Sequence, residues 1–286
     1  MAILLILNPI SGDIDKSNFL KVLKNKLGKK VNTLNIFKTT GKNDLERLKQ
    51  HLQEHTYNKV LVAGGDGTVK LAAECLLNTS IPIGVIPLGS ANGLATDLEL
   101  PTTIDASINV ALGQNTRKID ALFINGNLCL HMSDLGINAA LIKAYERSSV
   151  RGKLGYLFAG IPTLLNNKNP QSFSIKINEQ KLIRRGIMLG IANSRRYGTG
   201  ALVNPEGIID DGYFELLIFK ELNIKEIIKT LRDEKSYNSS FLEIISCQQA
   251  KICCETPTDF QIDGEYLGKA SSVEIKIEQK ALNIMI

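Results

Sequence analysis

Two hydrophobic periods alternate along the first 120 residues of the chain. Continuous apolar runs are typical of strands buried on both faces, and they are expected at Ala2–Leu7, Asn32–Phe37, Lys59–Ala63 and Ile83–Ile86. Apolar side chains at helical spacing predict helices after Ser17, after Asp44, over Val69–Leu77 and in a short stretch after the last strand. This alternation of strand and helix predicts a parallel sheet with right-handed crossovers.

The pattern changes after Asp120. Asn125-Gly126 predicts a hairpin within Phe123–His131, and helices are expected over 138–165 and 223–235. Short alternating runs predict strands at Ser174–Ile177, Gly186–Ala192, Phe214–Phe219, Ala250–Glu255, Asp259–Ile262 and Ser272–Ile277. The sequence therefore predicts an α/β domain over 1–122 and a β-rich domain over 123–286, with a β-sandwich as the expected architecture of the second.

Two glycine-rich loops follow neighbouring predicted strands. The first reads Gly64-Gly65-Asp66-Gly67-Thr68, and the second is the Pro-Leu-Gly-Ser-Ala-Asn-Gly stretch at 87–93. Glycines let consecutive N–H groups turn toward one anion, and a helix N-terminus adds favourable partial charge. Thr68 is placed to cap the helix or to hydrogen-bond a phosphate, and Asp66 would need a cation such as Mg²⁺ between it and phosphates. A tight strand–helix turn is the alternative for a single loop of this kind.

In their order along the chain, these motifs resemble the diacylglycerol kinase catalytic-domain family, which includes soluble bacterial lipid kinases and sphingosine kinases. The resemblance is carried by Asn8-Pro9, GGDGT, PLGSAN, Asn193–Gly200, Asn204–Tyr213 and Asp263-Gly264-Glu265. It implies an NAD-kinase-like nucleotide-binding domain followed by a lipid-substrate domain of β-sandwich type. It also implies transfer of the γ-phosphoryl group of ATP to a lipid hydroxyl, with Mg²⁺ required.

The resemblance also implies roles for individual residues. The residues expected to bind ATP are Asn8, Thr39, Gly64, Gly65, Asp66, Gly67, Thr68, Val69, Gly89, Ser90 and Asn92. Asp66 and Asp120 would belong to the carboxylate network around Mg²⁺, and Glu265 would be the general base. A second, structural Mg²⁺ would lie at Asp211 with the carbonyl oxygens of Ile208 and Tyr213, since oxygen ligands suit this ion.

Each of these residues has an alternative interpretation. Asp120 could be a turn carboxylate, Asp210-Asp211-Gly212 a simple turn, and Glu265 a solvated residue after an Asp-Gly hairpin turn, while Thr40 could replace Thr39. The family's second loop commonly reads G-T-x-N-D in diacylglycerol kinases, whereas Gly93 stands here in place of the Asp. The string at 89–95 is closer to that of sphingosine and ceramide kinases, which puts the lipid class in doubt. Where the family has three consecutive glycines, this chain has Gly-Thr-Gly at 198–200.

Charge is segmented along the chain. The net formal charge is +5, and residues 141–200 alone carry 11 Lys and Arg against 2 acids. An anionic partner is therefore expected, with a solvated basic face as the alternative. Arg147, Arg151 and Lys153 precede the apolar stretch Leu154–Leu165, a combination that fits either an anionic phospholipid surface or a domain core.

Composition narrows the functional classes. Trp is absent and aromatic residues make up 6%, which disfavours nucleic acid as a partner. Five cysteines with no C-x-x-C pair indicate a reduced, cytoplasmic protein without a Cys/His metal site. No apolar run is long enough to span a bilayer. Because an enzyme that acts on a lipid must still reach the bilayer surface, peripheral membrane association is expected; a homodimer is possible.

The leading hypothesis is therefore an ATP-dependent lipid kinase. The alternatives are a kinase of a soluble substrate such as NAD on the same scaffold, and a catalytically silent protein that binds nucleotide or lipid.

Overall fold

The computed structural model describes residues 2–12, 16–28, 33–136, 139, 170–197, 201–232 and 238–286. The chain divides into two compact units, the first made of Met1–Ile119 with Lys280–Ile286 and the second of Asp120–Gln279. The last seven residues thus belong to the first unit, a return that the hydrophobic pattern does not predict.

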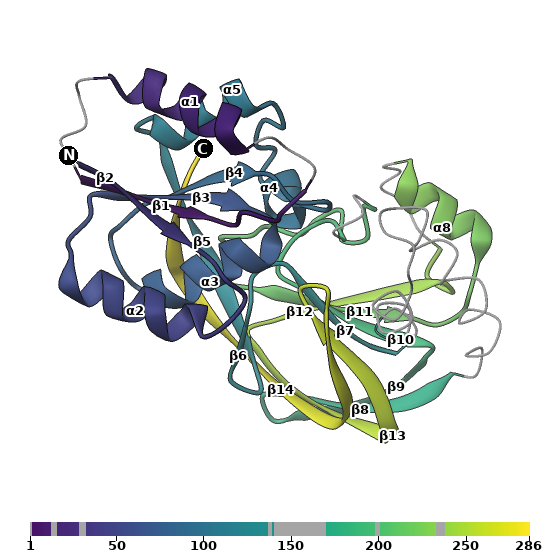
Figure 1. The fold of residues 1–286 in the computed structure, drawn as a ribbon. Coiled ribbons are helices and arrows are strands. Elements are labelled where there is room, and N and C mark those ends of the chain that lie inside the picture. The colour runs from purple at the N-terminus through teal and green to yellow at the C-terminus, as the bar shows by residue number, and fades with distance from the viewer. Residues whose placement is uncertain are drawn as a thin grey trace. The chain divides into compact units, whose positions relative to one another are not determined.

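The first unit is an α/β domain built on a parallel sheet (Figure 1). Its strands lie in the order β2-β1-β3-β4, and the end of β14 pairs in parallel with β4. The strands span β1 (Ala2–Leu7), β2 (Thr33–Lys38), β3 (Lys59–Gly64), β4 (Ile83–Pro87) and β14 (Glu265–Met285). Every residue of β3 and β4 is buried, as a strand covered on both faces requires.

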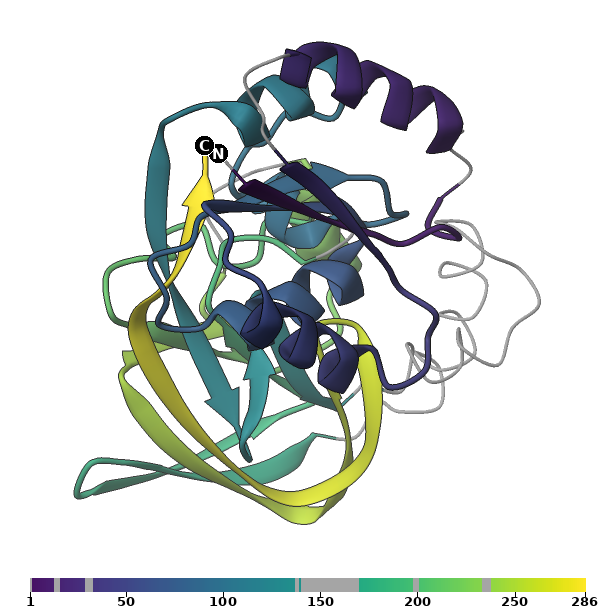
Figure 2. The same cartoon turned by 60° about the vertical axis from the view of Figure 1, so that its left-hand side comes forward.

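Helices cover both faces of this sheet (Figures 1 and 2). They are α1 (Lys16–Leu27), α2 (Asp44–Glu54), α3 (Asp66–Leu76), α4 (Gly93–Asp97) and α5 (Ile104–Leu112). On one face, Phe19 and Leu23 of α1 and Ile108 of α5 pack on apolar side chains of β1 and β3. On the other face, α2 lies against α3. The predicted α/β class and its strands are confirmed; α5 was not predicted.

The second unit is a β-sandwich of mainly antiparallel strands. Its strands are the part of β5 (Thr116–Ile124) from Asp120 onward, β6 (Asn127–Cys129), β7 (Met132–Gly136), β8 (Gln171–Ile177), β9 (Gln180–Gly186), β10 (Met188–Ala192), β11 (Phe214–Phe219), β12 (Leu242–Cys247), β13 (Gln249–Ile262) and most of β14. They pair in the order β12-β11-β10-β7-β13-β14, while β8 joins β13 to β9. The one helix with assigned bounds among its described residues is α8 (Ile224–Leu231).

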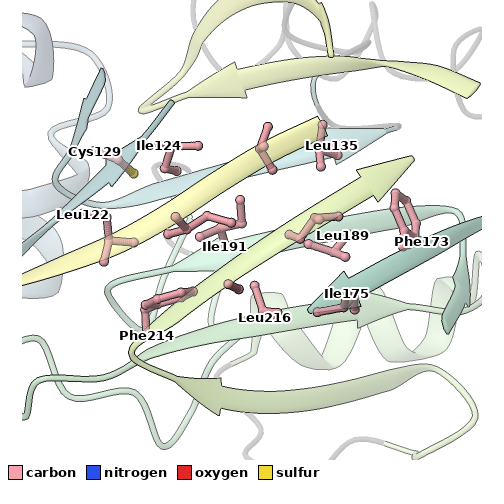
Figure 3. Packing of buried hydrophobic residues seen from close by; sticks show 14 of the residues in the cluster. Leu122, Ile124, Cys129, Leu135, Phe173, Ile175, Leu189, Ile191, Phe214 and Leu216 are labelled. Atoms are coloured by element: carbon pink, nitrogen blue, oxygen red, sulfur yellow. The ribbon is translucent and has the colours of Figure 1, made fainter. Parts of the chain in front are cut away.

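An apolar cluster fills the interior of the sandwich (Figure 3). Side chains from strands distant in sequence meet there, among them Leu122 of β5, Phe173 of β8, Ile191 of β10 and Phe214 of β11, all fully buried. Burying such a side chain contributes about 1.5–3 kcal/mol relative to leaving it exposed. The predicted β-sandwich is therefore confirmed, and its core draws on alternate residues of the strands.

Several element predictions need correction. The expected strand Gly186–Ala192 is divided, because Gly186 ends β9 and β10 begins at Met188. Strands β9 and β12 were missed because apolar Ile183 and Ile244 stand at exposed positions and break the alternation of apolar and polar residues. The two expected strands at 250–255 and 259–262 are one strand, β13, with an irregularity between Cys253 and Thr258. The helix expected over 138–165 lies outside the described residues, apart from Ala139.

Candidate functional site

The first glycine loop is shorter than the sequence predicts. Strand β3 ends at Gly64, Gly65 is the N-cap residue, and α3 begins at Asp66. The N–H of Thr68 donates to the Gly65 carbonyl at 2.9 Å, so Asp66, Gly67 and Thr68 form the first helical turn. The prediction that Thr68 caps the helix is wrong, because the cap position belongs to Gly65. The Thr68 hydroxyl instead accepts a hydrogen bond from the Asn8 amide at 3.4 Å.

Glycine is required where the two loops meet. A Cβ placed on Gly89 would lie 2.5 Å from the Cα of Gly65, and one placed on Gly65 would lie 3.2 Å from the Cα of Gly89. The first contact is closer than real Cβ atoms come to other atoms, and both involve backbone that cannot turn aside. The two loops therefore touch main chain to main chain, and they lie at the edge of the sheet where α3 and α4 begin (Figure 1).

Asn92 holds the second loop in shape. Its side chain accepts a hydrogen bond from the Gly89 N–H at 2.9 Å and donates one to the Gly89 carbonyl at 2.8 Å. The φ angle of Asn92 is +53°, in the left-handed region that Asn tolerates better than most residues. Ser90, between these two residues, is exposed. Asn92 therefore closes the loop on itself and leaves the hydroxyl-bearing Ser90 at its tip.

Asp66 connects the two loops. Its carboxylate accepts a hydrogen bond from the Gly93 N–H at 3.0 Å and a longer one from the Leu94 N–H at 3.4 Å. These N–H groups open α4, where the partial positive charge of a helix N-terminus favours a carboxylate. Gly93, the residue that departs from the family's Asp, thus contacts Asp66 through its main chain.

Asn8 and Thr39 lie at the ends of the adjacent strands. The N–H of Asn8 donates to the Ala63 carbonyl at 3.0 Å, and the N–H of Thr39 donates to the Leu7 carbonyl at 3.0 Å. The structure therefore brings Asn8, Thr39, the 64–69 segment and the 89–92 loop to one edge of the sheet. These are all the residues that the resemblance assigns to ATP.

Asp44 fixes the turn that follows Thr39. Its carboxylate accepts hydrogen bonds from the Thr40 N–H at 3.0 Å and the Gly41 N–H at 2.7 Å, and Arg47 lies 2.6 Å away. Partial burial alone would raise the pKa of Asp44, but these hydrogen bonds and the Arg47 charge hold it below its ordinary value of 3.8. Thr40 is thus engaged in the turn itself, which leaves Thr39 as the better candidate of the two for a ligand contact.

Asp120 lies in the second unit and is fully buried. Its carboxylate accepts a hydrogen bond from the Gly212 N–H at 2.7 Å, and its own N–H donates to the Ile209 carbonyl at 2.8 Å. Asp120 therefore braces the 208–213 turn from both its main chain and its side chain. This geometry gives Asp120 a structural role, while its predicted part in a metal network with Asp66 stays a prediction.

The braced turn carries the predicted structural metal ligands. Asp211 accepts a hydrogen bond from the Tyr213 N–H at 2.9 Å, and Ile208 and Tyr213 have exposed side chains. One carboxylate and two main-chain carbonyls form an all-oxygen donor set of the kind that Mg²⁺ accepts, so the turn fits the ion. Across the residues that the structure describes, no cluster of three or more His, Cys, Asp or Glu side chains could hold a metal. Carbonyl oxygens are thus essential to this assignment.

A buried carboxylate that the sequence did not single out lies near this turn. Glu215 accepts hydrogen bonds from the Asn204 amide at 2.7 Å and the Ser246 hydroxyl at 3.1 Å. Burial raises the pKa of Glu215, with the Asp211 charge acting in the same direction. A polar residue within the apolar run of β11 is the only sequence signal for it.

Glu265 follows a two-residue hairpin turn. Ile262 pairs with Glu265, and the residues between them, Asp263 and Gly264, have φ angles of +50° and +86°. Positive φ at both positions is the type I′ geometry for which Asp-Gly is a preferred sequence. The Glu265 side chain is exposed at the start of β14, where a general base could meet a substrate.

Some predicted features lie outside the described residues. They are the Gly-Thr-Gly triplet at 198–200 and the basic and apolar segment that contains Arg147, Arg151, Lys153 and Leu154–Leu165. Of the described helices, none combines the length and apolar character needed to span a membrane.

Two family models together match nearly the whole chain. Residues 2–124 match the diacylglycerol kinase catalytic domain, and residues 132–286 match the YegS C-terminal NAD kinase beta sandwich-like domain. The chain belongs to the diacylglycerol kinase family. It is therefore a kinase by family, and the resemblance inferred from its motifs is confirmed.

Relatives within this family align over most of their length. A probable lipid kinase YegS of Escherichia fergusonii is 28% identical, over 96% of this chain and 93% of the relative. A diacylglycerol kinase of Staphylococcus epidermidis is also 28% identical, over 96% of this chain and 89% of the relative.

Solved structures share the fold. A putative diacylglycerol kinase from Bacillus anthracis superposes with a TM-score of 0.81 at 21% identity, covering 99% of this chain and 96% of that one. An NAD kinase from Archaeoglobus fulgidus in complex with ATP superposes with a TM-score of 0.53 at 11% identity, covering 100% and 94%. At these identities the likeness shows the fold alone, and it confirms the predicted architecture of a diacylglycerol kinase with an NAD-kinase-like scaffold.

Proposed function

We propose that this chain transfers the γ-phosphoryl group of ATP to a hydroxyl group of a lipid, with Mg²⁺ as the required ion. The observation that carries the proposal is the joined pair of glycine loops, in which Gly65 and Gly89 touch through their main chains and Asp66 bridges to Gly93. Such close, side-chain-free backbone beside a helix N-terminus can accept phosphate groups. The Asp66 carboxylate in the same place would repel a bare phosphate, so it suits a nucleotide whose phosphates carry a metal ion.

The residues divide the work between binding and proton transfer. Asn8, Thr39, the 64–69 segment, Gly89, Ser90 and Asn92 would hold ATP, since they gather at one edge of the sheet. Asp66 and Asp120 would serve the ion, which when bound neutralises charge on the phosphate oxygens. Glu265 would accept the proton of the lipid hydroxyl, and Asp211 with the carbonyls of Ile208 and Tyr213 would hold a structural Mg²⁺.

A lipid substrate requires the protein to work at a membrane surface. The basic residues Arg147, Arg151 and Lys153, next to the apolar stretch Leu154–Leu165, support attraction to anionic headgroups of about 1 kcal/mol for each cationic residue near the surface. We therefore propose peripheral association with anionic phospholipid membranes on the cytoplasmic side. A diacylglycerol-like and a sphingoid-like lipid are both compatible with the loop sequence at 89–95.

The test is ADP release measured with ATP and Mg²⁺ in the presence of mixed micelles of diacylglycerol, sphingosine or ceramide, and separately with NAD in solution. We expect one lipid to stimulate ADP release well above the lipid-free rate and excess chelator to abolish it. If NAD and not a lipid stimulates ADP release, the protein is a kinase of a soluble substrate. If no acceptor stimulates release while ATP binds, the chain is a silent nucleotide-binding protein.

A further inference from the structure

The Asp-Gly turn before Glu265 is bound to the neighbouring segment by its own carboxylate. Asp263 accepts hydrogen bonds from three consecutive N–H groups: those of Leu130 at 2.9 Å, His131 at 2.9 Å and Met132 at 3.2 Å. Its own N–H donates to the Met132 carbonyl at 2.8 Å. Hydrogen bonds to a charged acceptor are roughly twice as strong as neutral ones. A short surface hairpin does not require such contacts, because Asp-Gly alone specifies the turn.

A second set of contacts holds the turn from its other side. The Gln261 side chain accepts a hydrogen bond from the Gly264 N–H at 2.8 Å and donates one to the Asp134 carboxylate at 2.6 Å. Gln261 and Asp134 are buried and face each other across β13 and β7. Both central residues of the turn are thus tied to the β7 side of the sandwich, one through Asp263 and one through Gln261.

We infer that Asp263 and Gln261 are positioning residues that fix the place of Glu265, an inference that rests on the proposed function. Glu265 follows the turn directly, and its backbone pairs with Ile262. An exposed side chain on a free hairpin would sample many positions, whereas a base must stay within hydrogen-bond reach of the proton that it takes. Displacement of a catalytic group by about 1 Å can cost about 10²-fold in rate. The two sets of contacts therefore restrict where the Glu265 carboxylate can be.

Two substitutions separate this role from turn formation. Asp263→Asn keeps a residue that favours positive φ but replaces one acceptor oxygen by a donor, while Asp263→Gly removes the side chain and leaves a Gly-Gly turn. Neither change strains the backbone, so both variants are expected to fold. Tyr266→Phe is the matched control, because it removes a 2.6 Å hydrogen bond to Asp259 on the same hairpin without touching the turn.

Hydrogen exchange on the full chain tests the contacts without any activity. Protection of the Leu130, His131 and Met132 amides should fall in Asp263→Gly and Asp263→Asn and stay unchanged in Tyr266→Phe. Unchanged protection in Asp263→Gly would overturn the inference. Unchanged protection would leave the proposed function standing, because the exchange experiment does not measure activity. Conversely, a wild-type protein without lipid kinase activity would overturn the proposed function and leave the exchange result as it is.

Kinetics then test the role. We expect kcat to fall about 10-fold in Asp263→Asn and up to about 10²-fold in Asp263→Gly, with the KM for ATP near the wild-type value. The melting temperature should fall in Asp263→Gly, because three hydrogen bonds to a charged acceptor are lost, while the protein still folds. In a Glu265→Gln background, Asp263→Gly should lower kcat no further, because it acts through Glu265. A full additional loss in that background, or a wild-type kcat in both single variants, would contradict the assignment.

Discussion

The carboxylate of Asp66 lies 3.0 Å from the main-chain nitrogen of Gly93, so the acid of the first glycine loop is anchored to the start of α4. The contact uses the main-chain N–H of Gly93, so it does not depend on the Asp side chain that the family commonly has at this position. Gly93 is buried, and its φ angle is not positive. The backbone conformation at position 93 therefore does not require glycine.

The first prediction concerns Asp66. Asp66→Asn keeps an oxygen for the Gly93 N–H but removes the charge that the metal–nucleotide complex needs, so turnover should fall by orders of magnitude with the fold unchanged. Asp105→Asn is the control, since Asp105 is an exposed carboxylate of the same unit whose described contacts are to Lys26 and Asn109, away from both glycine loops. Circular dichroism and lipid kinase assays measure both. Near-normal turnover in Asp66→Asn would show that its charge has no catalytic part.

The second prediction concerns Asn92 and uses two substitutions. Asn92→Gly keeps the positive φ but loses both hydrogen bonds to Gly89, each contributing about 0.5–1.5 kcal/mol. Asn92→Ala loses the same bonds and adds the cost of a left-handed φ, about 1–2 kcal/mol. Denaturant unfolding should therefore rank wild type above Asn92→Gly above Asn92→Ala, and ATP affinity should follow this order. Equal stability of the two variants would exclude a contribution from backbone strain.

The third prediction concerns pH and Asp44. Its pKa in the folded protein is below the ordinary 3.8, so its contacts add stability above that pH and lose it as the pH falls through the folded value. Asp44→Asn should thus be less stable than wild type at about pH 6, and the difference should shrink toward about pH 3. Unfolding curves of the two proteins across this range measure it. A difference that stays constant with pH would mean that the Asp44 charge does not stabilise the Thr40–Gly41 turn.

Much of this site was predictable from the sequence because it depends on local signals. A buried strand, glycines and a helix follow one another twice, and parallel strands place their carboxyl ends at one edge. The Asp66–Gly93 contact was not predictable, since it joins two residues of different loops. The return of β14 to the first unit was equally hidden, because its pairing with β4 joins distant parts of the chain.

Polar residues inside β-strands were the weakest part of the sequence reasoning. Asp134, Glu215 and Gln261 occupy buried positions of strands, and only the structure shows the hydrogen bonds that they make. Asp263 was visible as a turn residue, but its three N–H contacts come from a segment some 130 positions earlier in the chain. Long-range pairing of this kind leaves no periodic pattern in the sequence.

The fourth prediction concerns the membrane. Changing Arg147, Arg151 and Lys153 together to Glu should abolish sedimentation with anionic vesicles, and wild-type binding should weaken as salt is added. The control changes Lys21, Lys24 and Lys49 to Glu, an equal change of charge at exposed positions of the first unit. Equal loss in both triple variants would assign the effect to net charge alone. Vesicle binding that does not change with salt or in either triple variant would show that this segment does not contact the membrane.

The central claim is tested most directly by following the labelled γ-phosphate of ATP into an isolated product. Wild-type protein, Mg²⁺ and a lipid mixture are incubated, and the label is measured in the organic phase after extraction. The account predicts a labelled lipid phosphate with wild type and a loss of about 10²–10⁴-fold with Glu265→Gln, the range expected for removal of a general base. Label that stays in the aqueous phase with every lipid, or that enters lipid equally well with Glu265→Gln, would contradict it.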